Sequence, residues 1–265
     1  MQYVIEGNRG GEGYAKQIAS RLFGKPSAYK PQREPVVIRP AGMIVEDLCQ
    51  FEDMDWAKYA FSREPLNGKF DDAARYELTQ KAFECGAKVA QECITEHDTN
   101  DPIKIANAMG LKVSYPMTPQ DGGRVLFAEF YPPSEVSIFM DAVDKADALF
   151  EKQGVREALG DINIPNILLS HELFHFMEDR QADSIWTKTY KLELWKIGPI
   201  RNCSRITVLS EIAAMGFCKR LNELPYAPYV MDAFLVYGYS SDLASRLYEE
   251  MMRFAERAAR EPAEL

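Results

Sequence analysis

The sequence predicts a mostly helical α+β fold, in which a small sheet of about three strands packs on a helix with a His-Glu-x-x-His motif. Two observations support this prediction. Segments with the apolar spacing of helices, several bounded by capping residues, account for most of the 265 residues. Three short runs rich in strand-forming residues lie between residues 111 and 140, before the motif helix.

Residues 1–98 are predicted to form an N-terminal, mostly helical region of unknown role. Residues 1–6 have the composition of a short strand, and the glycine-rich stretch at 7–13 predicts a flexible turn. A phosphate-binding loop is excluded because Tyr14 follows Gly13, where that loop requires a lysine. Helices are expected up to about residue 23, then, after a proline-rich passage, from 42 to about 63 and from 71 or 72 to about 96.

Residues 99–265 are predicted to form a domain built around the motif helix. Asp101 caps a short helix that Gly110 ends, and Asn163 caps the motif helix, which begins at Pro165 and runs to about Gln181. The expected strands cover residues 111–115, 124–131 and 135–140. Further helices are expected at 141–160, around residue 211, at 229–239 and at 242–260.

Composition and charge exclude several classes of protein. The net charge is -9 and no stripe of lysine and arginine is present, which argues against nucleic-acid binding. No apolar run approaches the roughly 18 residues of a membrane helix, and the N-terminus lacks the features of a signal peptide. The five cysteines are odd in number and scattered. We therefore expect a reduced, cytoplasmic protein without a membrane partner.

The sequence His-Glu-Leu-Phe-His at residues 171–175 has the spacing of a metal site on a helix. Residues four apart share one helix face, so His171 and His175 would direct two imidazoles at one point, with Glu172 beside it. A catalytic zinc needs such nitrogen ligands and a carboxylate that accepts a proton from water. The alternative is a buried helix whose two histidines are hydrogen-bonded in the core. His97, the third histidine, is assigned no role.

A catalytic zinc normally has a third protein ligand. A histidine six residues after the motif is excluded, because Gln181 stands there. Glu211 is the best candidate, because it lies in an otherwise apolar helical stretch where an unpaired carboxylate would cost several kcal/mol. The alternative for Glu211 is a buried salt bridge to Arg201 or Arg205.

Other acidic residues near the motif are expected at the surface or as partners of the ligands. Asp179 lies one helical turn beyond His175 and is a candidate acceptor for its second N–H. The same expectation, surface residue or partner, applies to the remaining members of this set: Glu178, Asp183 and Glu193.

The stretch from about Asp101 to Leu221 resembles the ImmA/IrrE-type zinc metallopeptidases. The resemblance rests on the order helix, small sheet, motif helix and glutamate helix. The matching segments are 105–113, 138–140, 169–175 and 211–217. The chain departs from the family pattern at Phe174, where glycine is usual, and at Met215, near the position where asparagine is usual. The first hundred residues have no counterpart in that family.

This resemblance implies a zincin-like core and a zinc peptidase of one zinc per chain. His171, His175 and Glu211 would be its metal ligands and Glu172 its general base. We further expect a peptide or protein substrate, held by the edge of the small sheet at the 135–140 strand. Tyr190 or Arg205 would supply a second donor to the oxyanion. The sequence leaves the oligomeric state open.

Two other functions compete with this reading. One is a non-catalytic regulatory or interaction protein that binds a metal on the same fold. Structural zinc sites usually fill all four positions and have no need of the acid beside the histidines, so Glu172 favours the enzyme. The other is a zinc aminopeptidase, and the chain has no Gly-x-Met-x-Asn-like sequence to bind a free amine.

Overall fold

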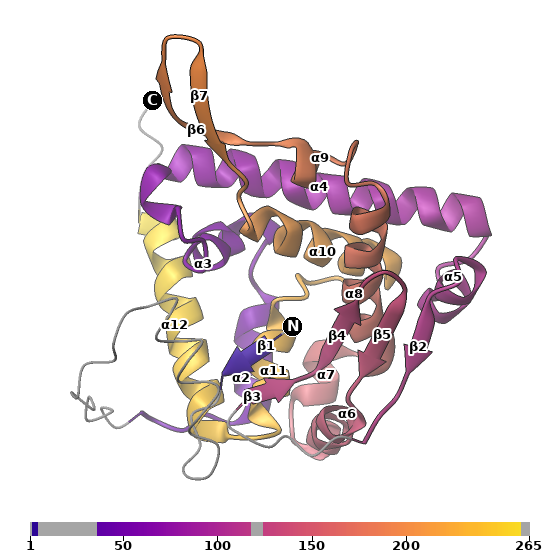
Figure 1. Cartoon of the computed structure of the whole chain (residues 1–265). Coiled ribbons are helices and arrows are strands. Elements are labelled where there is room, and N and C mark those ends of the chain that lie inside the picture. Colours follow the sequence, from indigo (N-terminus) through magenta and orange to yellow (C-terminus); the bar gives the residue numbers. More distant parts are fainter. Residues whose placement is uncertain (1, 5–35, 118–123, 261–265) are drawn as a thin grey trace, which may run out of the picture.

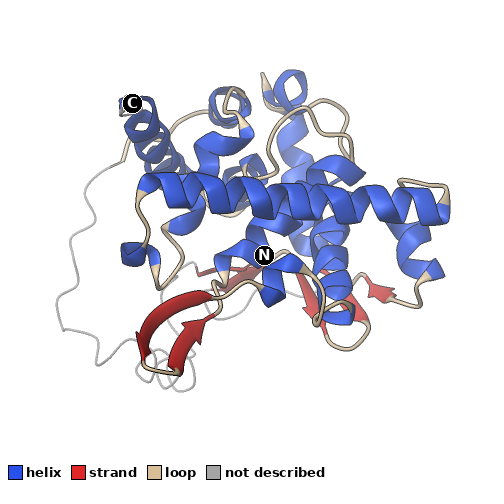
Figure 2. Ribbon diagram, turned by 90° about the horizontal axis from the view of Figure 1, so that it is seen from above, coloured by secondary structure: helices blue, strands red, loops and turns tan. Residues whose placement is uncertain are grey.

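The described residues form helices and three small sheets, a mostly helical α+β architecture (Figures 1 and 2). This computed structural model describes residues 2–4, 36–117 and 124–260. The turn predicted at 7–13 and the helix predicted to end near residue 23 lie outside the described residues. The predicted fold class is confirmed.

Most elements lie close to their predicted positions. The described helices are α2 (Ala41–Cys49), α3 (Ala57–Phe61), α4 (Asp72–His97), α5 (Pro102–Ala108), α6 (Met140–Asp147), α7 (Val155–Leu159), α8 (Ile164–Arg180), α9 (Trp186–Thr189), α10 (Val208–Leu221), α11 (Val230–Tyr237) and α12 (Ser241–Arg260). Short 3-10 turns are η1 (Asp53–Trp56), η2 (Asn67–Lys69) and η3 (Ala148–Glu151). The strands are β1 (Gln2–Val4), β2 (Lys112–Ser114), β3 (Arg124–Leu126), β4 (Ala128–Tyr131), β5 (Glu135–Ile138), β6 (Leu192–Ile197) and β7 (Ile200–Ser204).

The predicted three-stranded sheet has the order β2-β5-β4 and packs on α8. Strand β5 pairs in parallel with β2 and antiparallel with β4, so it is the central strand. The expectation that the 135–140 strand offers an edge to substrate is therefore wrong. The two outer strands are β2 and β4. Of these, β4 lies beside α8 (Figure 1).

The strand predicted at 124–131 is interrupted at Phe127. This side chain is fully buried, and its backbone C=O accepts a hydrogen bond from the Phe139 N–H at 3.0 Å. The chain changes partner at this point, because β3 pairs with β1 and β4 pairs with β5. A run of strand-forming residues predicts extended structure but not a change of pairing partner within it.

Helices α4 and α10 cross with their backbones in contact. A Cβ atom added to Gly86 of α4 would lie 1.8 Å from the Ala213 carbonyl oxygen, and one added to Gly216 of α10 would lie 2.2 Å from the Phe83 carbonyl oxygen. Only glycine allows so close an approach at these two positions. Helix α4 is the longest described helix, and α10 packs closely against it (Figure 1). This contact fixes the position of α10 in the protein.

The single helix predicted from residue 42 to about 63 is wrong. The structure divides this segment into α2, η1 and α3, because α2 ends at Cys49 and a capping box starts η1. In that box the Glu52 backbone N–H donates to the Asp55 carboxylate at 2.9 Å. The break lets Trp56 and Phe61 enter the same core as the later helices, each with at most 1% of its surface exposed.

The predicted helix at 141–160 is likewise divided into α6, η3 and α7, and Gly154 with φ 84° precedes α7. The hairpin of β6 and β7 was not predicted from the sequence at all. It projects from the body of the protein (Figure 1), and Trp195, Ile197 and Ile200 on it are exposed. Strands without a buried face lack the alternation on which strand prediction depends.

Candidate metal centre

Helix α8, which carries both motif histidines, is capped at its N-terminus and largely buried. Its N-terminus is capped by Asn163, whose side chain accepts a hydrogen bond from the Asn166 N–H at 2.9 Å, and Pro165 lies in its first turn. Most side chains of the helix are buried, and His171 itself is only 5% exposed. Apolar packing of this kind limits the movement of side chains that hold a ligand.

Helix α10 brings Glu211 to the same place from its first turn, where the helix dipole favours a carboxylate. The start of α10 is bound to the segment that follows α3. There, Glu64 accepts hydrogen bonds from the Val208 backbone N–H at 3.1 Å and from the Thr207 hydroxyl at 2.9 Å. This contact and the glycine crossing with α4 together hold Glu211 against α8.

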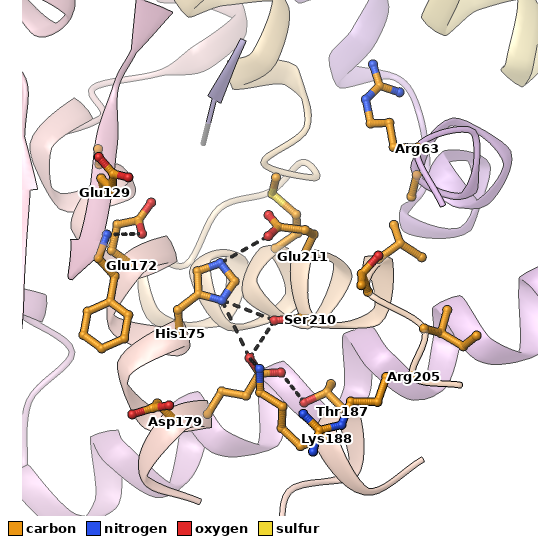
Figure 3. A pocket seen from close by; sticks show the side chains of 18 of the residues that line it. Arg63, Glu129, Glu172, His175, Asp179, Thr187, Lys188, Arg205, Ser210 and Glu211 are labelled. Carbon is orange, nitrogen blue, oxygen red and sulfur yellow. Dashed lines mark hydrogen bonds and ion pairs between the residues drawn. The ribbon is translucent and has the colours of Figure 1, made fainter. Parts of the chain in front are cut away.

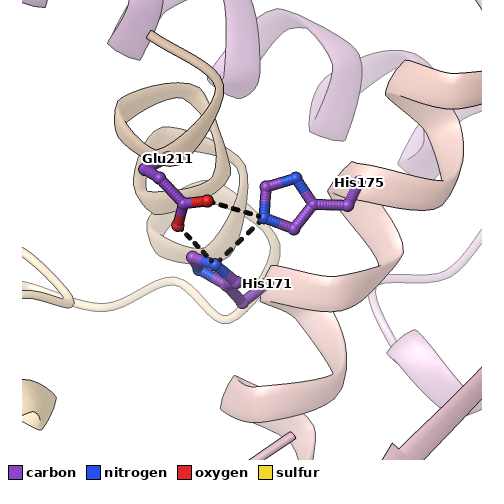
Figure 4. Close-up of side chains that lie close together, drawn as sticks. All are labelled: His171, His175 and Glu211. Carbon is purple, nitrogen blue, oxygen red and sulfur yellow. Dashed lines mark hydrogen bonds and ion pairs between the residues drawn. The ribbon is translucent and has the colours of Figure 1, made fainter. Parts of the chain in front are cut away.

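The three predicted ligands converge on one point (Figure 4). The Nε2 atoms of His171 and His175 are 3.2 Å apart. The Glu211 carboxylate places Oε2 3.2 Å from His171 Nε2 and Oε1 3.5 Å from His175 Nε2. Within the described part of the chain, this is the one group of three or more His, Cys, Asp or Glu side chains with such closely placed ligand atoms.

These separations fit a tetrahedral zinc ion. With metal–ligand bonds of about 2.0–2.1 Å, two ligand atoms of a tetrahedral site lie about 3.3 Å apart. In a core without a metal, each Nε2 would be expected to bind a separate partner, whereas here both Nε2 atoms face each other and share the one carboxylate of Glu211. Two imidazole nitrogens also favour zinc over magnesium or calcium, which prefer oxygen ligands.

A buried glutamate, Glu178, lies next to His175. Its Oε2 is 3.9 Å from His175 Nδ1, and the Ser210 hydroxyl lies 3.3 Å from the same nitrogen and donates to Glu178 at 2.6 Å. The expected partner of His175 was Asp179, and that expectation is wrong, because residue 179 is exposed whereas residue 178 faces the ring. Such partners orient a metal-binding imidazole.

Glu178 also joins α9 to this network. It accepts hydrogen bonds from the Thr187 hydroxyl at 2.5 Å and from Lys188 Nζ at 2.9 Å. Burial alone would raise the pKa of Glu178, but the nearby imidazole of His175 and the hydrogen bonds from Ser210, Thr187 and Lys188 outweigh it and lower the pKa to about 2. The carboxylate is therefore charged at neutral pH and holds the ring of His175 in place.

The two imidazoles differ in their electrostatic surroundings. Burial lowers the pKa of His171, although the Glu211 carboxylate opposes the shift. Burial also acts to lower the pKa of His175, but there the nearby carboxylates of Glu178 and Glu211 prevail and raise it. A metal ion binds only the deprotonated nitrogen, so it competes with protons mainly at His175.

Glu172 is held beside the ligands by the outer strand of the sheet. Its Oε2 accepts a hydrogen bond from the Phe130 backbone N–H of β4 at 3.0 Å, and the side chain is 3% exposed. The residue lines the same cleft as His175 and Glu211 (Figure 3). The carboxylate thus has a fixed position next to the metal ligands, as a general base requires.

Two of the three predicted ligands, His175 and Glu211, line a cleft of about 830 Å³ together with Glu172. Its walls come from β4, α8, α10 and the region of α3, so residues on both sides of position 98 contribute to it. A volume of this size is ordinary for a binding cleft.

Glu211 lies with the two histidines as predicted, but it is not the buried carboxylate that its apolar sequence neighbours led us to expect. Its neighbours Ile212 and Ala213 are fully buried, but the Glu211 side chain is 54% exposed because it faces the cleft. Among the described residues, the ion pairs of Glu211 are with His171 and His175, and Arg201 pairs with Glu193 at 3.7 Å.

Of the two expected oxyanion donors, the structure places only Arg205 at the cleft. The ring of Tyr190 packs at an angle against Trp186, with ring centroids 5.2 Å apart. Tyr190 is not among the described residues that line the cleft. Asp183 and Glu193 are exposed, as expected. Sequence reasoning missed Glu64 and left Glu178 open as either a surface residue or a partner of the ligands, since a carboxylate in polar sequence surroundings gives no sign that it becomes buried.

Comparison of the chain with protein-family models, with curated proteins and with solved structures gives no match. Among the described helices, none combines the length and apolar character needed to cross a membrane. The proposed function therefore rests on the geometry of the candidate metal centre.

Proposed function

We propose that this protein is a zinc-dependent peptidase. The observation that carries the proposal is the convergence of His171 Nε2, His175 Nε2 and the Glu211 carboxylate, with Glu172 fixed beside them in an open cleft. The two nitrogens are 3.2 Å apart, and the carboxylate places one oxygen 3.2 Å from His171 Nε2 and the other 3.5 Å from His175 Nε2. A purely structural metal site has no need of an open cleft or of a carboxylate that does not bind the metal. The resemblance to the ImmA/IrrE-type peptidases stays a prediction.

His171, His175 and Glu211 would hold the ion, and zinc at this position would supply a Lewis acid that lowers the pKa of water toward 7. Glu172 accepts the proton of the attacking water on its carboxylate and passes it to the nitrogen of the leaving amine. The Phe130 N–H, at 3.0 Å from Glu172 Oε2, keeps that carboxylate aimed into the cleft while it exchanges the proton.

The position of β4 supports an extended peptide as substrate. Residues 128–130 of this outer strand line the cleft, next to Glu172. A peptide that runs along β4 would bring successive carbonyl groups past the metal centre, since β-strand addition aligns one backbone with another. The sequence predicted this role for the 135–140 strand, but β5 is the central strand, so β4 takes its place in the proposal.

Digestion of a mixed peptide pool by the purified full-length chain, analysed by mass spectrometry, tests the proposal. We expect about one zinc per chain, cleavage of the pool, and loss of cleavage with a zinc chelator that is reversed by added zinc. Stoichiometric zinc without any cleavage would instead favour a non-catalytic metal-binding regulator. Absence of bound zinc would contradict both functions.

A further inference from the structure

The cleft has walls of opposite charge (Figure 3). Glu129 of β4 and Asp179 of α8 lie on one side, and Arg63 and Arg205 lie on the other. The metal ligands lie between the two walls. A peptide in the cleft would therefore meet carboxylates on one side and guanidinium groups on the other.

Most charged groups that line the cleft already have partners. Lys188 pairs with Glu178 at 2.9 Å, and Arg63 lies 3.7 Å from Glu250. Asp179 and Arg205 differ, because neither side chain forms an ion pair or hydrogen bond with any residue of the described part of the chain. Both are exposed, and both face the same end of the cleft from opposite sides.

Arg205 projects from a well-fixed backbone. It lies directly after β7, and the next residue, Ile206, is 2% exposed. Beyond it, Thr207 is held by its hydrogen bond to Glu64 at 2.9 Å. The base of the side chain is therefore rigid, while its guanidinium group is presented to the cleft. A guanidinium in this position can bind a carboxylate through two parallel hydrogen bonds.

We propose that Arg205 determines specificity by binding one acidic side chain of the substrate peptide close to the scissile bond. The inference rests on the proposed peptidase function and names its substrate class. Side chains of an extended peptide alternate between its two faces, so a neighbouring residue would face Asp179, which favours a basic side chain. The net charge of -9 would repel a long acidic tract, so the substrate that we propose carries a single acidic residue at the position that Arg205 binds.

The test compares the cleavage sites of the wild type, Arg205→Glu and Lys196→Glu in one peptide pool of balanced composition, each protein loaded with zinc. Lys196 is an exposed residue of the β6–β7 hairpin outside the described cleft lining, so its substitution makes the same change of charge away from the substrate. We expect Asp or Glu to be enriched at one position in the wild type and in Lys196→Glu. In Arg205→Glu we expect this preference to fall about tenfold, mainly through KM, and Lys or Arg to replace it.

The possible outcomes separate the two proposals. Cleavage by the wild type without an acidic preference, or an unchanged preference in Arg205→Glu, overturns the specificity role alone. No cleavage by zinc-loaded wild type contradicts the peptidase function, and the specificity role with it. Loss of the preference in both variants would show a general effect of charge and would also contradict a role specific to Arg205.

Discussion

Glu64 accepts a hydrogen bond from the Val208 backbone N–H at the start of α10, the helix that carries Glu211. This bond joins the first hundred residues to the metal centre. A carboxylate that satisfies free N–H groups at a helix N-terminus stabilises that helix and fixes where it begins. The N-terminal region thus helps to position Glu211, the proposed third ligand, a role that the sequence did not reveal.

Replacement of Glu64 by alanine should therefore weaken both the fold and the site. We expect a loss of about 1–3 kcal/mol in the free energy of unfolding, because the Val208 N–H and Thr207 hydroxyl lose their acceptor, and a measurable fall in zinc affinity. Urea unfolding and a competition assay with a zinc-binding dye measure the two effects. Asp71→Ala removes a cap of α4 that is remote from the site and should lower stability by about 1 kcal/mol without changing zinc affinity.

The crossing of α4 and α10 gives a second prediction. Gly86→Ala and Gly216→Ala should each destabilise the protein by about 1–3 kcal/mol or more, because the new methyl group would overlap a backbone carbonyl of the other helix. Thermal unfolding measures the change. Gly68→Ala is the control, since a Cβ atom there meets nothing within 4 Å. Equal stability of all three variants would show that the helices do not approach this closely.

Glu178 gives a third prediction, about metal affinity. Glu178→Gln should weaken zinc binding about 10- to 100-fold, because the neutral amide no longer holds the His175 ring or compensates Lys188. Asp179→Asn removes the adjacent, exposed carboxylate and should leave zinc affinity unchanged. Zinc titrations of the two variants and the wild type measure the affinities. If Glu178→Gln bound zinc as tightly as Asp179→Asn, Glu178 would have no role in metal binding.

A fourth prediction separates metal binding from proton transfer. Glu172→Gln should keep its zinc and lose peptide cleavage by several orders of magnitude, because an amide cannot accept the proton of water. His171→Ala should lose the zinc itself. Zinc analysis and turnover are measured on the same samples. Normal turnover by the Gln variant would refute the assignment of Glu172 as general base.

Local signals in the sequence predicted several helix starts correctly, although two of the predicted long helices proved to be divided. Asp71, Asp101 and Asn163 all cap the helices that they were expected to begin. The four-residue spacing of His171 and His175 is also local, so it predicted their common face. These features depend on neighbours in the sequence and need no knowledge of the tertiary fold.

Features that depend on tertiary contacts were missed or misjudged. Glu211 was chosen as a buried carboxylate, whereas it faces the cleft. Asp179 was preferred to Glu178 by helical spacing alone, but the contacts of α9 and α10 decide which of the two is buried. The β6–β7 hairpin has no buried face, and the central place of β5 follows from strand order, which no local pattern encodes.

X-ray diffraction from crystals of the full-length protein, at wavelengths just above and below the zinc absorption edge, tests the central claim most directly. The account predicts an anomalous peak at the high-energy wavelength alone, about 2.0–2.2 Å from His171 Nε2, His175 Nε2 and a Glu211 carboxylate oxygen. A zinc-supplemented crystal in which these side chains contact each other without such a peak would contradict it.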